Sequence, residues 1–167
     1  MNKNRHINKV TIIGSGIMGS RIACHFANIG TEVLLLDIIP PNISKGEKKD
    51  KKSRNSIVND ALRKTLKSKP SPIYSKEFTS RISTGNLEDD LHKISESDWI
   101  IEAVVEKLEV KKEVFKKIEE YRKKGTIISS NTSGIPIEDM LDERSEDFQK
   151  HFCGTHFFNP PRYLRLF

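Results

Sequence analysis

Three glycines near the start of the chain have the spacing of a phosphate-binding turn. Gly14, Gly16 and Gly19 form the pattern G-x-G-x-x-G directly after the apolar run 10–13. The first glycine permits a tight reversal, the second lets a pyrophosphate approach the backbone, and the third lets a helix pack closely on a strand. The free N–H groups at the start of the following helix attract phosphate charge. The pattern therefore predicts a dinucleotide-binding turn.

An acidic residue ends the next apolar run. Residues 32–37 read Glu-Val-Leu-Leu-Leu-Asp, which places Asp37 eighteen residues after Gly19. A carboxylate at about this distance accepts hydrogen bonds from the adenosine ribose hydroxyls and repels a 2′-phosphate, so NAD is favoured over NADP. The expected cofactor-binding residues in this part of the chain are Gly14, Gly16, Ile17, Met18, Gly19 and Asp37.

These residues need a scaffold, and the sequence predicts alternating strands and helices. Strands are expected at 10–13, 32–37, 81–84, 98–102, 126–130 and 152–156, with helices at 18–29, 45–68, 86–94, 107–121, 135–141 and 144–149. A further strand is expected to begin at 162–167. The alternation predicts an α/β fold, a Rossmann-type, doubly wound and mostly parallel sheet in one domain over residues 1–167. The charged stretch 45–68 is expected to be a projecting basic helical excursion.

Five polar residues follow the predicted strands. Asp37, Glu106, Ser133, His156 and Asn159 all lie at or just beyond a strand end. Because ligands bind at the carboxyl ends of strands in a doubly wound sheet, these residues form a candidate site.

The composition and charge exclude other classes of protein. The 167 residues are 35% hydrophobic and 31% charged, and the apolar runs are only strand-sized, so no membrane span is expected. The polar N-terminus lacks a signal-peptide pattern, which favours the cytoplasm. The net charge of +6 arises in residues 45–69, which hold ten Lys or Arg and three Asp or Glu, so no general nucleic-acid surface is expected. Cys24 and Cys153 are expected to be buried thiols, with no metal site.

Four motifs, in this order, resemble those of a known family. They are Gly14-Ser-Gly-Ile-Met-Gly19, Glu102-Ala-Val-Val-Glu106, Ser130-Asn-Thr-Ser133 and His156-Phe-Phe-Asn-Pro160. Over almost the whole chain they resemble the NAD-binding domain of 3-hydroxyacyl-CoA dehydrogenases. The resemblance implies conversion of (S)-3-hydroxyacyl-CoA and NAD+ to 3-oxoacyl-CoA and NADH in the β-oxidation of fatty acids. It also implies an acyl-CoA substrate and a homodimeric parent enzyme.

The same resemblance implies roles for individual residues. His156 is the expected general base that takes the hydroxyl proton, a role that suits an imidazole near neutral pH. Ser133 is expected to hydrogen-bond the reacting oxygen, and Asn159 to hold substrate and base in register. Glu106 and Lys111 match positions that contact the nicotinamide end of the cofactor. Ser or Lys residues of the basic helix resemble those that meet the CoA phosphates, although Ala61 stands where some members have Ser.

The end of the chain departs from the family pattern. Family members place a glutamate twelve residues after the histidine, which here would be one residue beyond Phe167. They also continue into a helical domain that closes over the substrate and forms the dimer interface. The expectation is therefore a cofactor-binding half that binds NAD(H) but turns over poorly or not at all alone, with apolar surface exposed near Phe157, Phe158 and 163–167. Loss of an acid that orients a catalytic histidine costs several kcal/mol in comparable pairs.

Three other functions stay open at this point. G-x-G-x-M-G also opens other hydroxyacid dehydrogenases, which act on small carboxylates and often use a catalytic lysine. A non-catalytic NAD(H)-binding or scaffold domain would keep the fold without the chemistry. A nucleic-acid binder would need the 45–69 segment to bind in a strongly salt-dependent way.

Overall fold

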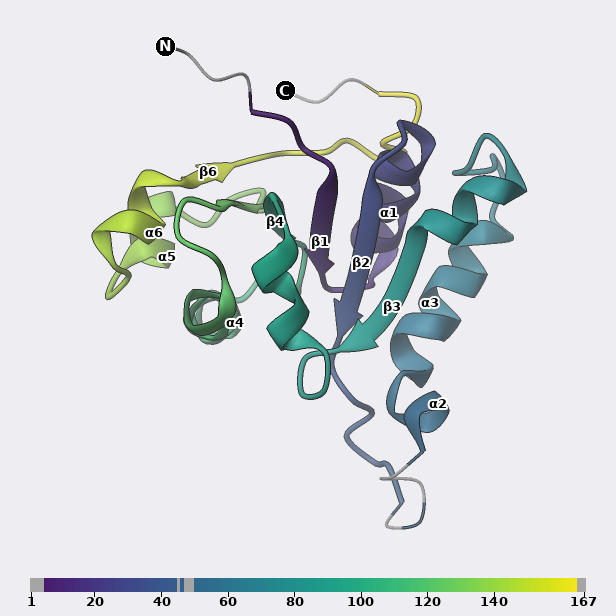
Figure 1. Cartoon of the computed structure of the whole chain (residues 1–167), viewed down its shortest axis with the longest axis horizontal. Helices are drawn as coiled ribbons and strands as arrows, with labels where there is room; N and C mark the ends of the chain where they lie inside the picture. Colours follow the sequence, from purple (N-terminus) through teal and green to yellow (C-terminus); the bar gives the residue numbers. More distant parts are fainter. Residues whose placement is uncertain (1–4, 45, 47–49, 165–167) are drawn as a thin grey trace.

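The computed structural model describes residues 5–44, 46 and 50–164. Six strands form one sheet in the order β3-β2-β1-β4-β5-β6, and every neighbouring pair is parallel (Figure 1). The strands are β1 (Lys9–Ile13), β2 (Glu32–Asp37), β3 (Ile82–Asn86), β4 (Trp99–Glu102), β5 (Ile127–Ser130) and β6 (Phe152–Gly154). The predicted doubly wound parallel sheet is confirmed.

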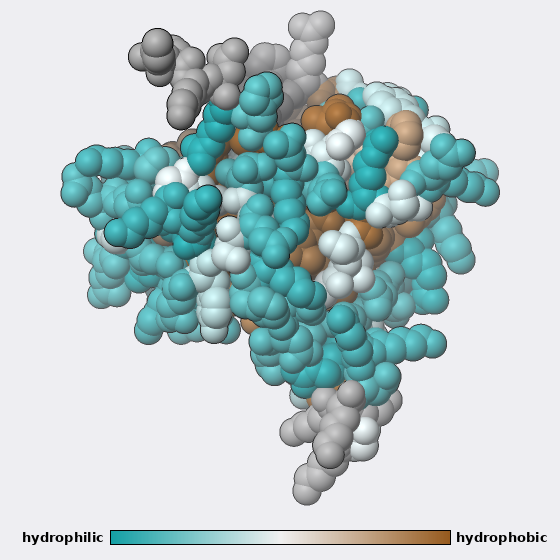
Figure 2. Space-filling model, in the orientation of Figure 1, coloured by the Kyte–Doolittle hydropathy of each residue, from teal (hydrophilic) through white to brown (hydrophobic). Residues whose placement is uncertain are grey.

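Helices cover both faces of this sheet. They are α1 (Ile17–Asn28), α2 (Lys51–Arg54), α3 (Ser56–Leu66), α4 (Leu108–Tyr121), α5 (Ile137–Leu141) and α6 (Glu146–Lys150), with 3₁₀-helices η2 (Lys76–Arg81) and η3 (Leu91–Glu96). In the described part of the chain, no helix has the length and apolar character needed to cross a bilayer. Figure 2 shows hydrophilic side chains over most of the visible face, with apolar residues visible mainly near its centre and upper edge.

Strand β2 shows why the sheet is covered on both faces. Its side chains alternate in direction, so Val33 and Leu35 join the core under α1 and α3, whereas Leu34 and Leu36 join the core under α4, α5 and α6. All four side chains are almost completely buried. A continuous apolar run is therefore what a central parallel strand requires.

The direction in which strands are added to the sheet reverses at β1. The chain passes from β1 to β2 and β3 on one side of β1, and then returns to β4 on its other side. In doubly wound sheets, ligands bind beyond the carboxyl ends of the strands at such a reversal, which here lies at β1 and β4. The strands β1, β2 and β3 all point toward the lower edge of the view in Figure 1.

The predicted single helix over 45–68 is wrong in its extent. Residues 45 and 47–49 lie outside the described residues, and the rest forms two helices that meet at Asn55. The Asp50 side chain caps α2, and the buried Asn55 side chain accepts a hydrogen bond from Asn86 Nδ2 at 2.7 Å. Because Val58 is buried against α1 and the sheet, α3 packs onto the domain, and α2 lies beyond the strand ends (Figure 1).

The predicted helix over 86–94 is also wrong. Strand β3 continues to Asn86, whose side-chain oxygen then accepts hydrogen bonds from the backbone N–H groups of Glu88 and Asp89. This side chain holds the chain in a turn, as asparagine commonly does, and only the 3₁₀-helix η3 follows.

Three predictions of burial or local structure fail near the surface of the domain. Cys153 is exposed because β6 is an edge strand. Phe157 is buried, packed edge-on against the ring of Phe26. Residues 161–164 form a turn closed by the hydrogen bond from Tyr163 N to the carbonyl of Pro160 rather than a strand, and 165–167 lie outside the described residues.

Candidate functional site

The glycine turn between β1 and α1 has the geometry that its sequence predicts. Gly14 has φ +101°, which favours glycine, and a Cβ at Gly19 would lie 1.8 Å from the carbonyl oxygen of Gly14. A Cβ at Gly16 would meet nothing within 4 Å, so the space above this residue is open. Among the described residues, no side chain caps the N-terminus of α1. The turn therefore presents uncapped backbone N–H groups at an open surface, which suits an anion.

Asp37 lies beside this turn at the end of β2. Its Oδ2 accepts hydrogen bonds from the backbone N–H and the hydroxyl of Ser15, at 2.6 and 2.5 Å, and its Oδ1 accepts one from Ile38 N at 2.7 Å. A carboxylate has about four acceptor positions, so the half-buried side chain keeps capacity for the hydroxyls of a ligand.

A polar cluster lies across β1 from Asp37, where β4 and β5 end. Glu106 Oε1 accepts hydrogen bonds from the Thr132 hydroxyl at 2.5 Å and from the backbone N–H groups of Ser133 and Gly134 at 3.0 and 3.3 Å. The loop after β4 thus holds the loop after β5 through one carboxylate.

The charge of Glu106 is stabilised by these donors. Burial raises the pKa of the carboxyl group, but the Thr132 hydroxyl, the Ser133 N–H and the Lys111 ammonium group outweigh it and lower the pKa from 4.5 to about 2. Glu106 is therefore a fixed negative charge over the neutral pH range.

A buried ion pair lies beneath Glu106. The ammonium group of Lys111 lies 2.8 and 2.9 Å from the two carboxylate oxygens of Glu102 and 3.1 Å from Glu106 Oε2. The side chains of Lys111 and Glu102 are both completely buried, whereas that of Glu106 is 43% exposed. In this structure Lys111 therefore faces carboxylates below the surface of the site.

His156 lies two residues beyond β6 and contacts the same loop. Its Nδ1 lies 3.2 Å from the carbonyl oxygen of Thr132, and its ring centroid lies 5.2 Å from that of Phe158. A carbonyl oxygen only accepts, so this contact assigns the proton to Nδ1 and leaves the lone pair of Nε2 free. In this tautomer the imidazole can take a proton from a ligand.

Asn159 extends the site toward the cofactor helix. Its Oδ1 accepts a hydrogen bond from Arg21 Nη1 at 2.5 Å, which joins the segment after β6 to α1. Nearby, the Asn131 side chain accepts a hydrogen bond from Phe157 N at 2.9 Å and so fixes the start of the same segment.

The structure joins the predicted site residues in two groups. Glu106, Ser133 and His156 are linked through the 131–134 loop, and Asp37 is joined to the glycine turn through Ser15. Asn159 contacts Arg21 and has no recorded hydrogen bond to His156 within the part of the chain that the structure describes.

Four polar residues that build the site had no predicted role: Arg21, Glu102, Ser130 and Thr132. An acid that ends the otherwise apolar run Trp-Ile-Ile-Glu was a usable signal for Glu102. Nothing in the spacing of Thr132 or Arg21 indicated their contacts.

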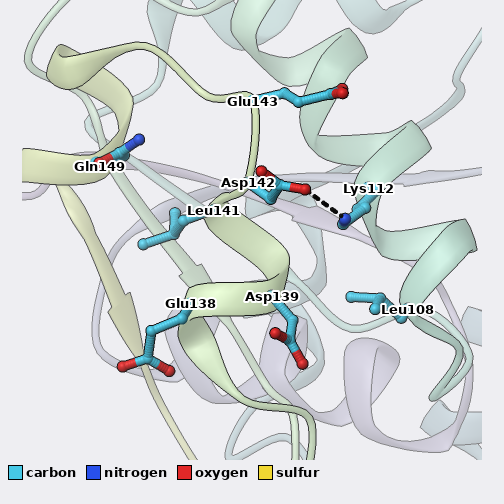
Figure 3. A pocket seen from close by; sticks show the side chains of 8 residues that line it. All are labelled: Leu108, Lys112, Glu138, Asp139, Leu141, Asp142, Glu143 and Gln149. Carbon is cyan, nitrogen blue, oxygen red and sulfur yellow. Dashed lines mark hydrogen bonds and ion pairs between the residues drawn. The ribbon is translucent and has the colours of Figure 1, made fainter.

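Two of the larger hollows in the part of the chain that the structure describes differ in their lining. A groove of about 490 Å³ lies between the glycine turn and α3, lined by Ser15, Gly16, Ile17, Ile57, Asp60, Ala61, Lys64 and Thr65. A second hollow of about 540 Å³ lies among α4, α5 and α6, where Glu138, Asp139, Asp142 and Glu143 gather and Lys112 pairs with Asp142 at 3.1 Å (Figure 3). Across residues 5–44, 46 and 50–164, no group of three or more His, Cys, Asp or Glu is arranged to hold a metal ion. Of these two hollows, the first adjoins the strand-end site.

Comparison with known families agrees with the motifs and the geometry. Residues 9–167 match the profile of the family described as "3-hydroxyacyl-CoA dehydrogenase, NAD binding domain". The chain belongs to this family. Its cofactor is NAD, and the residues present fit the cofactor: the space above Gly16 is open, the N-terminus of α1 is uncapped, and Asp37 ends β2.

Individual relatives are similar over nearly the whole chain. A "Probable 3-hydroxyacyl-CoA dehydrogenase" of Bacillus subtilis is 53% identical, over 98% of this chain and 21% of its own length. A "Putative fatty acid oxidation complex trifunctional enzyme" of Rickettsia felis is 43% identical, over 96% of this chain and 21% of its own length. The crystal structure of 3-hydroxybutyryl-CoA dehydrogenase from Escherichia coli matches with a TM-score of 0.66 and 29% identity. The match covers 94% of this chain and 31% of the crystallised chain. The chain thus spans about a fifth of the length of these two relatives and about a third of that crystal structure's chain.

Proposed function

We propose that this domain serves an enzyme that converts (S)-3-hydroxyacyl-CoA and NAD+ to 3-oxoacyl-CoA, NADH and a proton. The observation that carries the proposal is the position of His156, whose Nδ1 contacts the loop that Glu106 holds, at the same sheet edge as the glycine turn. Oxidation of an alcohol requires a base for the hydroxyl proton and a cofactor that accepts the hydride. A histidine and a cofactor-binding turn at the same edge of the sheet meet this requirement.

The proposed role of His156 is to take the proton of the substrate hydroxyl at Nε2. The contact of Nδ1 with the Thr132 carbonyl orients the ring for this transfer. When bound, NAD supplies the hydride acceptor. The exposed Ser133 is proposed to hydrogen-bond the reacting oxygen, and Asn159, held by Arg21, to keep the substrate in register.

Cofactor binding is proposed to use residues on both sides of the carboxyl end of β1. Gly14, Gly16 and Gly19 shape the turn, and Ile17 and Met18 begin the helix whose N–H groups face the pyrophosphate. Asp37 accepts hydrogen bonds from the hydroxyls of the adenosine ribose. The negative charge of Glu106 lies toward the other end of the cofactor, and Lys111 holds that carboxylate from beneath.

The acyl-CoA substrate is proposed to lie along the groove between the glycine turn and α3. Lys64 lines this groove, and Arg63 and Lys67 are exposed on the same helix or directly after it. These cations suit the phosphates of CoA. The name of the Rickettsia relative supports fatty acid oxidation as the process, and the cytoplasm is the proposed location.

The complete enzyme is proposed to form a homodimer through a helical domain outside this chain. Phe158, Tyr163 and Leu164 are 41%, 53% and 47% exposed and could be covered by other parts of the enzyme. Sedimentation of the complete enzyme as a monomer at high concentration would contradict this assembly.

The reaction is tested by NADH oxidation with acetoacetyl-CoA, beside a direct NADH titration. We expect NADH to bind, and we expect slow turnover, because no carboxylate is hydrogen-bonded to His156 among residues 5–44, 46 and 50–164. A sensitive single-turnover assay should show oxidation that His156→Gln abolishes and that free acetoacetate does not support. Oxidation that persists in His156→Gln, or that free acetoacetate supports equally well, would point to another dehydrogenase. Tight NADH binding without any detectable oxidation would favour a non-catalytic binding domain.

A further inference from the structure

The completely buried carboxylate of Glu102 has a full set of hydrogen-bond donors. Its Oε1 accepts from Val104 N at 2.7 Å and from Lys111 Nζ at 2.8 Å, and its Oε2 accepts from the Ser130 hydroxyl at 2.5 Å and from Lys111 Nζ at 2.9 Å. These donors come from the loop after β4, from α4 and from the end of β5. One side chain therefore connects the three segments that surround the polar cluster.

We infer that Glu102 is a positioning residue for the nicotinamide half of the cofactor, acting through Lys111 and Val104 on Glu106 and the 131–134 loop. This inference rests on the proposed function. Glu102 has no exposed surface and cannot itself touch a ligand in this structure. Its influence on a ligand passes through Lys111, which also lies 3.1 Å from the half-exposed carboxylate of Glu106.

The strand register places this network under one end of the cofactor. Ile13, the last residue of β1, pairs with Leu36 of β2 on one side and with Glu102 of β4 on the other. The pyrophosphate belongs over the glycine turn after β1, and the adenosine belongs beside Asp37 after β2. The nicotinamide half must then extend across β1 toward the ends of β4 and β5, where Glu102 pairs with Ser130.

Burial of this ion pair needs an explanation other than stability. Removal of two charges from water carries a large desolvation cost, and apolar replacements of similar volume are often as stable. A geometric role explains the pair, because Glu102 and Lys111 fix the carboxylate of Glu106, which alone holds three donors of the 131–134 loop.

The test compares two ligands that differ at the nicotinamide. NADH and ADP-ribose share the adenosine, the pyrophosphate and the second ribose, and only NADH carries the nicotinamide ring. The unsubstituted chain, the Glu102→Gln variant and the double variant Glu102→Met/Lys111→Met are each titrated with both ligands by calorimetry. The double variant removes the buried charges together and so guards against a single variant that does not fold. Glu113→Gln, on the exposed face of α4, is the matched control.

We expect the dissociation constant for NADH to rise about tenfold in both site variants, and that for ADP-ribose to change by less than about twofold. The control should bind both ligands as the unsubstituted chain does. An equal loss of both ligands in the folded double variant would show a purely structural role and overturn the inference, as would unchanged NADH binding. If the unsubstituted chain binds neither ligand, the proposed function fails, and this inference fails with it.

Discussion

A Cβ atom at Gly19 would lie 1.8 Å from the carbonyl oxygen of Gly14, so the first turn of α1 is in contact with the backbone at the end of β1. Gly16, between them, has open space in the corresponding direction. Gly19 and Gly16 therefore serve different purposes, since Gly19 permits packing and Gly16 permits access.

Alanine substitutions separate these purposes. We expect Gly19→Ala to lower the free energy of unfolding by about 3 kcal/mol, because the obstacle is backbone that cannot rotate away. Gly16→Ala should change the free energy of unfolding by less than about 0.5 kcal/mol, yet weaken NADH binding at least about tenfold, because the methyl group occupies the approach of the pyrophosphate. Urea denaturation and NADH titration of both variants check this. A stable Gly19→Ala variant, or unchanged NADH binding by Gly16→Ala, would contradict it.

Asp37 should decide between the two dinucleotides. Asp37→Asn keeps an oxygen that can accept from Ser15 but removes the charge that repels a 2′-phosphate. We expect NADH to bind about tenfold more weakly, since a hydrogen bond to a charged group is lost, and NADPH to bind more tightly. Parallel titrations with NADH and NADPH measure the ratio. Glu32→Gln, at the exposed start of the same strand, is the control and should leave the ratio unchanged.

The buried pair should show strong coupling in a double-mutant cycle. Lys111→Met leaves the Glu102 carboxylate buried without its cation, and we expect the free energy of unfolding to fall by about 3–5 kcal/mol. Glu102→Met/Lys111→Met removes both charges and should recover a large part of that loss. Lys117→Met, on the exposed face of α4, should change the free energy of unfolding by less than about 0.5 kcal/mol. Urea denaturation of the four variants, Glu102→Met included, gives the coupling, and additive effects would refute it.

Glu106 should contribute stability only when it is ionised. Its pKa lies at about 2 in the folded chain against an ordinary 4.5, so the contribution is complete above pH 4.5 and is lost as the pH falls toward 2. We expect Glu106→Gln to be less stable than the unsubstituted chain by about 1 kcal/mol at pH 6, with the difference shrinking in acid. Denaturation curves from pH 6 to pH 3 measure it. A difference that stays constant over this range would show that the Glu106 charge does not hold the loop.

The cofactor end of the site was predictable because its signals are local. The signals are the spacing of Gly14, Gly16 and Gly19 and the acid at the end of the next strand, and all of them lie within 24 residues. The glycines are required by the geometry of the turn, and the acid is placed by the end of the strand. The alternation of apolar runs then places residues that are distant in sequence, such as Asp37 and His156, at one edge of a parallel sheet.

The polar cluster was less predictable because its contacts are tertiary. Lys111 lies in a helix with many charged residues, where a lysine normally faces solvent, and only the carboxylates of Glu102 and Glu106 make its burial possible. The contact between Thr132 and His156 joins residues 24 apart through a backbone carbonyl, which no side-chain pattern reveals. The break at Asn55 likewise depends on Asn86, on a different strand.

Hydrogen–deuterium exchange of the chain with and without NADH tests the central claim, which is that the cofactor binds across β1 from the Asp37 side to the Glu106 side. We predict that NADH slows exchange in residues 14–20 and also in residues 104–107 and 131–134. Protection that is absent from the glycine turn, or confined to the acidic hollow among α4, α5 and α6, would contradict this account of the site.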